Sequence, residues 1–216
     1  MLRMAFCVVC AMAWAGSAMA AERQSGMVVR VETGGARTAD VDWNMGGDLG
    51  SSHVYGAAVG WRVSPIFRAE LAYAHRPDFH YSGRDGTYNV SGNAANDTYM
   101  ANLYADLFTF GRLTPFVGIG GGRSVTTLDS ADYVSGAVSG SRNGTTSTTW
   151  AWQGIAGAGF AVTDWLSVDA SYRYVHAGRV RLENTGQVAG VSGTFSHDQA
   201  GTLSISEFIV GLRAEF

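Results

Sequence analysis

The chain has 216 residues, enough for one ordinary domain, and 46% of them are hydrophobic. Only 15% are charged, which is well below the roughly 25% of a typical soluble domain. All 15 basic residues are arginine, they form no cluster, and the formal net charge is −3, so we expect no binding to nucleic acid.

Residues 1–20 have the pattern of a signal peptide that is cleaved on export. A basic residue precedes an apolar run, and Ala18-Met19-Ala20 fits the small-x-small pattern of a cleavage site. Both cysteines, Cys7 and Cys10, lie inside this segment, so we expect the exported chain to have no disulfide and no thiolate metal site. The expected organisation is a signal peptide over 1–20 followed by a single domain over 21–216.

The rest of the chain alternates between apolar and polar residues with a period of two, which is typical of β-strands. No segment after residue 20 offers the about 18 uninterrupted apolar residues that indicate a transmembrane helix. The segment 166–174, for example, has leucine, valine, alanine and tyrosine on one face and serine, aspartate and arginine on the other. On this pattern we place eight strands, at about 26–35, 53–63, 67–78, 97–110, 114–124, 148–162, 165–176 and 203–216.

The connections between these strands alternate between short and long. The short ones are 63–66, 110–113 and 163–164, and the long ones are 36–52, 79–96, 125–147 and 177–202. Hairpins that share one end with tight turns and one end with long loops form an up-and-down barrel. We therefore predict an all-β fold, an eight-stranded antiparallel β-barrel in which the first strand pairs with the last.

Alternation alone leaves two kinds of barrel open. A soluble barrel would enclose apolar side chains such as Leu103, Val168 and Leu212, whereas a transmembrane barrel would turn them toward lipid. Aromatic residues recur near the expected strand ends, for example Trp61 and Phe216, and outer-membrane barrels have aromatic girdles at both membrane interfaces. The transmembrane barrel is therefore favoured.

Three segments carry a resemblance to a known family: 100–107 (MANLYADL), 114–122 (TPFVGIGGG) and 163–174 (TDWLSVDASYRY). With them the chain resembles the opacity-protein and OmpA-type family of small outer-membrane β-barrels. The resemblance implies a place in the outer membrane of a Gram-negative bacterium, among its lipids and lipopolysaccharide. It also implies that the barrel-assembly machinery reads the last strand, where the apolar residues are Phe208, Val210, Leu212 and Phe216.

The polar face of each strand is expected to line the interior, because an arginine facing lipid near the midplane costs about 2–4 kcal/mol. Eight strands leave an interior that side chains just fill, and each enclosed charge needs an opposite charge or water. We therefore predict a plug of arginine–carboxylate pairs. Its expected members are Arg30, Glu32, Arg68, Glu70, Asn102, Asp106, Asp169, Arg173, Glu207, Arg213 and Glu215. These include four arginines and six acids, an excess that would favour cations if a path existed.

A minor alternative is a lipid A-modifying enzyme. His80 and Ser82 have the His-x-Ser spacing of the small-barrel lipid A deacylases, and residues i and i+2 of a strand share a face. The match ends there, because Gly83-Arg84 follows where that family has an asparagine close behind. The five histidines are scattered along the chain, so we expect no catalytic residue, no metal site and no cofactor.

The sequence thus predicts a non-enzymatic, exported outer-membrane protein. Its four long connections, exposed and tolerant of change, are candidates for binding a host-surface ligand or for a role in envelope integrity. A second interpretation remains open, in which the barrel is a small porin-like channel of restricted conductance.

Overall fold

The computed structural model describes most of the chain after residue 25. The described residues are 26–41, 47–85, 88–135, 138–181, 185–188, 191–194 and 200–216. The expected signal peptide, residues 1–20, lies outside them, so its cleavage stays a prediction. Within the described ranges, no helix is long and apolar enough to cross a membrane.

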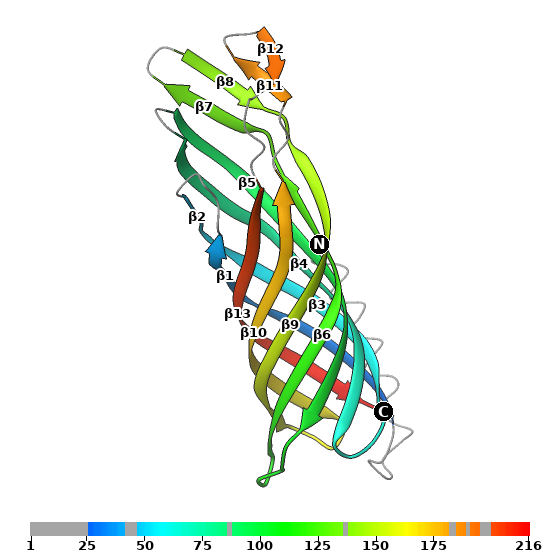
Figure 1. Ribbon diagram of the computed structural model, residues 1–216. Helices are drawn as coiled ribbons and strands as arrows, with labels where there is room; N and C mark the ends of the chain where they lie inside the picture. The colour runs from blue at the N-terminus through cyan, green and yellow to red at the C-terminus, as the bar shows by residue number, and fades with distance from the viewer. Residues whose placement is uncertain are drawn as a thin grey trace, which may run out of the picture.

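Eight strands form a closed antiparallel barrel (Figure 1). They are β1 (Gly26–Val41), β3 (Ser51–Arg62), β4 (Phe67–Asp85), β5 (Tyr88–Asp106), β6 (Leu113–Leu128), β9 (Thr145–Ala161), β10 (Leu166–Arg181) and β13 (Ala200–Glu215). Each strand pairs with the next in this order, and β1 closes the ring on β13, from Val28 opposite Glu215 to Val41 opposite Leu203. The predicted architecture and its closure are confirmed.

The strands run further toward the long-loop end than predicted. Strands β4 and β5 have 19 residues each, so most of the expected loop 79–96 is sheet. The five remaining strands extend that sheet: β2 (Gly47–Leu49), β7 (Ala131–Ser135), β8 (Val138–Arg142), β11 (Thr185–Val188) and β12 (Val191–Thr194). Within the described residues, the expected long connections 36–52, 79–96, 125–147 and 177–202 are therefore largely sheet. Glycine, serine and asparagine favour turns, but here they continue the ladder because a neighbouring strand supplies backbone partners.

This extra length projects beyond the membrane. A strand of 16 to 19 residues tilted by about 40° rises roughly 40–48 Å. The apolar band of an outer-membrane barrel is only about 25 Å tall. In Figure 1 the hairpins β7–β8 and β11–β12 stand beyond the long-loop end of the wall, and the C-terminus lies at the opposite end.

Tight turns define that opposite end. The connection 63–66 is where the sequence placed it, and the last short connection is 162–165. The middle one is longer than expected, because β5 ends at Asp106 and only an isolated bridge joins Phe110 to Leu113. The predicted strand 97–110 is wrong at this end: Leu107 and Phe108 are apolar and exposed, at 55% and 63%, in a turn and not in a strand.

Apolar side chains face outward. Leu103 and Leu212 are 48% and 43% exposed, and Ile119 is 69% exposed, whereas arginines and carboxylates are buried inside. This orientation is the one that a transmembrane barrel requires. Exposed aromatic side chains lie at two levels of the wall: Trp61, Phe67 and Phe160 beside the short turns, and Tyr99, Trp150 and Phe208 further up their strands.

Candidate functional site: the inside of the barrel

The structure places all eleven residues predicted for the polar network on the inner face. Asp106 and Glu215, near the short turns, are partly exposed. The other nine are buried: Arg30, Glu32, Arg68, Glu70, Asn102, Asp169, Arg173, Glu207 and Arg213. Alternate residues of a strand point to the same side, so each strand contributes inward side chains at every second position.

The centre of the network is Arg30 on β1. Its Nη1 lies 2.8 Å from Oε2 of Glu32, and its Nη2 lies 2.8 Å from Oε2 of Glu70 on β4. The same Nη2 donates a hydrogen bond of 2.7 Å to the hydroxyl of Tyr104. Arg173 on β10 approaches the other oxygen of Glu32, with Nη2 at 2.5 Å. One guanidinium thus joins two carboxylates, and one carboxylate joins two guanidiniums.

Toward the long-loop end the network continues through Glu207. This carboxylate accepts a hydrogen bond from Nε of Arg76, and both side chains are 0% exposed. Its second oxygen lies 3.5 Å from Nη1 of Arg173. Arg76 also donates to Oδ1 of Asn96 and to Oγ1 of Thr98, both at 3.1 Å. Asn96 in turn donates to two hydroxyls of β6.

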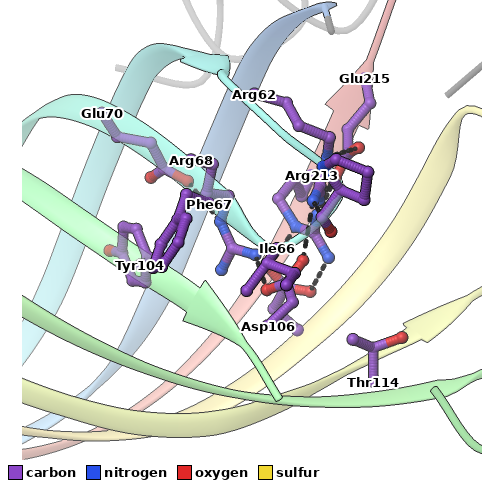
Figure 2. A network of polar contacts seen from close by, with 12 residues as sticks. Arg62, Ile66, Phe67, Arg68, Glu70, Tyr104, Asp106, Thr114, Arg213 and Glu215 are labelled. Carbon is purple, nitrogen blue, oxygen red and sulfur yellow. Dashed lines mark hydrogen bonds and ion pairs between the residues drawn. The ribbon is translucent and has the colours of Figure 1, made fainter. Parts of the chain in front are cut away.

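Toward the short turns the network reaches the barrel mouth (Figure 2). Arg68 joins Glu70 to Asp106, with Nε–Oε1 3.1 Å and Nη1–Oδ1 2.5 Å. Arg62 contacts the other oxygen of Asp106 at 2.9 Å and binds Glu215 through two parallel hydrogen bonds of 2.8 Å. Such bidentate pairs are the strongest geometry between arginine and a carboxylate.

The last pair joins the network through Glu215, which also contacts Arg213. Arg213 binds Asp169 by two bonds of 2.8 and 3.1 Å. All these ion pairs form one continuous network. Its arginines are Arg30, Arg62, Arg68, Arg76, Arg173 and Arg213, and its acids are Glu32, Glu70, Asp106, Asp169, Glu207 and Glu215. The network therefore has six charges of each sign.

The predicted acidic excess is wrong, because two arginines were missed. Arg76 lies on the same face of β4 as Arg68 and Glu70, so continuing the alternation along that strand would have found it. Arg62 is the last residue of β3 and faces inward beside the exposed Trp61. Arg62 lies in the predicted strand 53–63, where alternation with the outward Trp61 would have assigned it to the inner face.

Inward-facing glycines make room for these side chains. A Cβ on Gly120 would lie 2.0 Å from Oδ1 of Asn102, which accepts a hydrogen bond of 2.6 Å from Gln153. A Cβ on Gly118 would lie 2.6 Å from the ring of Tyr104. Gly121, in contrast, faces outward, and a Cβ on it would have no atom within 4 Å.

The change Gly120→Val is expected to lower the free energy of unfolding by about 1–3 kcal/mol, the usual cost of overpacking. The reason is that its side chain displaces the amide of Asn102. Unfolding in detergent micelles, followed by the mobility shift of the folded barrel on a gel, measures this loss. The change Gly121→Val is the matched control and should have a much smaller effect. Equal losses in the two variants would show that the crowding inside is not the cause.

An apolar cluster closes the interior on the long-loop side. It includes Phe79, Val175 and Ile205, which are at most 1% exposed. In each case the apolar residue lies closer to the long-loop end than the inward charges of the same strand. Only polar residues are predicted for the interior, so this cluster is a difference from the prediction. Its signal was the pair Leu203 and Ile205, which continue the inward face of β13 beyond Glu207.

A cavity of about 210 Å³ opens at the short-turn end. Its lining includes Arg62, Asp106, Arg213 and Glu215, so the ion pairs of the network form its inner wall. The cavity gives water access to the mouth of the barrel, which explains why Asp106 and Glu215 are less buried than the rest.

The family model of the outer membrane protein beta-barrel domain matches residues 6–216. The chain belongs to this family. The outer membrane protein PagN of Salmonella typhimurium is 28% identical over 159 residues, which cover 71% of this chain and 64% of PagN. The chain therefore spans slightly less than two thirds of that relative.

Two solved structures share the fold of this outer-membrane barrel. Neisserial surface protein A superposes with a TM-score of 0.55 at 18% identity, covering 88% of this chain and 97% of that one. The outer membrane protein OprG from Pseudomonas aeruginosa has a TM-score of 0.52 at 9% identity, with coverage of 89% and 97%. The family match and the relative PagN place the protein in the outer membrane of a Gram-negative bacterium.

His80, which the lipid A-modifying alternative requires, lies on the outside of the barrel. His80 is exposed, and its Nδ1 lies 3.0 Å from Oδ1 of Asn93. The side chain of Ser82 lies outside the described side chains. Within the described part of the chain, no group of three or more His, Cys, Asp or Glu is placed to hold a metal. Neither the described residues nor the relatives give positive evidence of catalysis.

The residues expected to form the assembly signal lie on β13 and at its end. Phe208, Val210 and Leu212 are 73%, 55% and 43% exposed on the outer wall. Phe216 packs against Trp165, with ring centroids 6.4 Å apart. The apolar face of the last strand is thus continuous with the lipid-facing surface, and its role in assembly stays a prediction.

Proposed function

We propose that this protein is a non-enzymatic surface barrel whose interior is plugged. The observation that carries the proposal is the continuous network of six arginines and six carboxylates inside it. A permeant ion would have to break buried pairs, and removing one partner of such a pair costs about 3–5 kcal/mol. The balanced charge also gives the interior no overall preference for ions of either sign.

The apolar cluster strengthens this proposal. Toward the long-loop end, the interior contains the buried apolar residues Phe79, Val175 and Ile205 beside buried hydroxyl groups such as those of Ser124 and Thr126. A hydrophobic constriction opposes the entry of water and ions. A solute that entered the cavity at the short-turn end would therefore meet first the ion pairs and then this apolar layer.

Recording in planar lipid bilayers tests the plug. The purified, refolded chain is expected to give no stable conductance, whereas a large porin inserted under the same conditions is the positive control. Insertion is verified independently by the mobility shift of the folded barrel on a gel. A reproducible conductance of the folded protein would contradict the plug and support the alternative, a small porin-like channel.

On the outside, the extended strands suit surface interaction. The described parts of the segments 36–52, 79–96, 125–147 and 177–202 contain strands that carry the sheet beyond the membrane, so a ligand would meet the edge or face of a sheet there. We include in the proposal that these segments bind a host-surface ligand or contribute to envelope integrity. We also propose that the protein contacts outer-membrane lipid, lipopolysaccharide and the barrel-assembly machinery.

A further inference from the structure

Arg123 stands on the outer wall of the barrel, unlike the six arginines of the internal network. It is exposed, and it lies on β6, ten residues beyond Leu113, the first residue of that strand. At about 3.3 Å per residue and a tilt of about 40°, this places it roughly 25 Å above the short-turn end. That height equals the apolar band of an outer-membrane barrel, so Arg123 lies at the extracellular membrane interface.

Two aromatic residues flank this arginine on the neighbouring strands. Trp150 is directly opposite on β9 and Tyr99 is directly opposite on β5. The guanidinium carbon of Arg123 lies 4.4 Å from the centroid of the Trp150 ring. Trp150 and Tyr99 are 72% and 55% exposed. Stacking occupies one face of the guanidinium and leaves the N–H donors at its edge available for an oxygen ligand.

The described residues give Arg123 no acidic partner. None of their ion pairs includes it. The acid on the adjacent part of β5 is Asp97, and its Oδ1 already contacts the hydroxyl of Tyr73 and Nδ1 of His75, each at 2.7 Å. A positive charge at the membrane interface is therefore available for an anion from the membrane.

We propose that Arg123, together with Tyr99 and Trp150, binds a phosphate group of lipid A. Arginine suits phosphate because its planar fork matches two oxygens at once. The height of Arg123 selects the outer leaflet, where lipid A is the anionic lipid. Gly121 lies two residues toward the membrane centre on the same face, with no atom within 4 Å of a built Cβ, which leaves room for an acyl chain below the phosphate.

The test uses the full chain refolded in zwitterionic micelles and titrated with three lipids. These are bis-phosphorylated lipid A, the same lipid A without its phosphates, and phosphatidylglycerol. The rise in unfolding temperature with lipid concentration gives an apparent affinity. We expect bis-phosphorylated lipid A to bind most tightly, and Arg123→Gln to weaken it about tenfold or more, the range of a charge-assisted hydrogen bond. Arg123→Lys keeps the charge but loses the planar fork, so its affinity should fall between those of wild type and Arg123→Gln.

The matched control is Arg112→Gln. Arg112 is an exposed arginine at the short-turn end, where its Nη1 donates to the carbonyl of Val162 at 3.4 Å, and its replacement should leave lipid A binding unchanged. Undiminished lipid A binding by Arg123→Gln would overturn the proposal. So would binding of dephosphorylated lipid A or phosphatidylglycerol as tight as that of bis-phosphorylated lipid A. These outcomes do not depend on conductance, so this inference and the plug can fail separately.

Discussion

The change Glu207→Leu is expected to lower the free energy of unfolding by about 3–5 kcal/mol. Glu207 and Arg76 are both 0% exposed, so the variant leaves the guanidinium of Arg76 as an unpaired charge inside the barrel. Its neutral contacts, Asn96 and Thr98, remain, but neither can neutralise it. Arg173, the second partner of Glu207, is affected less by the change, because it keeps its contact of 2.5 Å with Glu32.

Equilibrium unfolding in urea, with the barrel inserted in lipid vesicles, measures this loss. The double variant Arg76→Met with Glu207→Leu should recover most of it, because replacing both members of a buried ion pair by apolar residues is often nearly neutral. Asp129 is an exposed acid near the long-loop end, and Asp129→Asn should change stability by less than about 0.5 kcal/mol. If Glu207→Leu costs no more than Asp129→Asn, water must reach this pair and the interior is not sealed.

Much of the fold could be predicted because a barrel wall imposes a period of two on every strand. A transmembrane strand has lipid on one side and packed side chains on the other, so Leu103 and Asn102 must differ in polarity. Beyond the membrane this constraint ends, since water reaches the outer face as well. The second half of β4 and the first half of β5 therefore have no clear alternation, and their continuation as strands was missed.

The members of the internal network followed from alternation, but their pairing did not. Alternation assigns a residue to a face and gives no height along the tilted strand. Arg76 and Glu207 are 131 residues apart in the sequence, and only the stagger of β4 relative to β13 brings them together. The apolar cluster was missed for a related reason: once the interior was expected to be polar, inward leucine and isoleucine such as Leu203 and Ile205 had no assigned place.

The change Ile119→Arg tests whether the outer wall faces lipid. Ile119 is 69% exposed on β6 and lies six residues beyond Leu113, which corresponds to roughly 15 Å along the barrel axis. This is close to the middle of the apolar band, where an arginine on the lipid face costs about 2–4 kcal/mol. Equilibrium unfolding of the barrel in vesicles should show a loss of stability of this size.

A matched control lies on the same face of the same strand. Val125 is twelve residues beyond Leu113, roughly 30 Å along the axis and therefore at or above the extracellular interface. At this depth the cost of an arginine falls to about 0–1 kcal/mol, and Asp97 lies opposite on β5 as a possible counter-charge. Both variants add the same side chain to one wall, so the difference between Ile119→Arg and Val125→Arg measures membrane depth together with the contribution of the Asp97 counter-charge. Equal losses in vesicles would mean that water bathes both positions, and the lipid-facing assignment of β6 would be wrong.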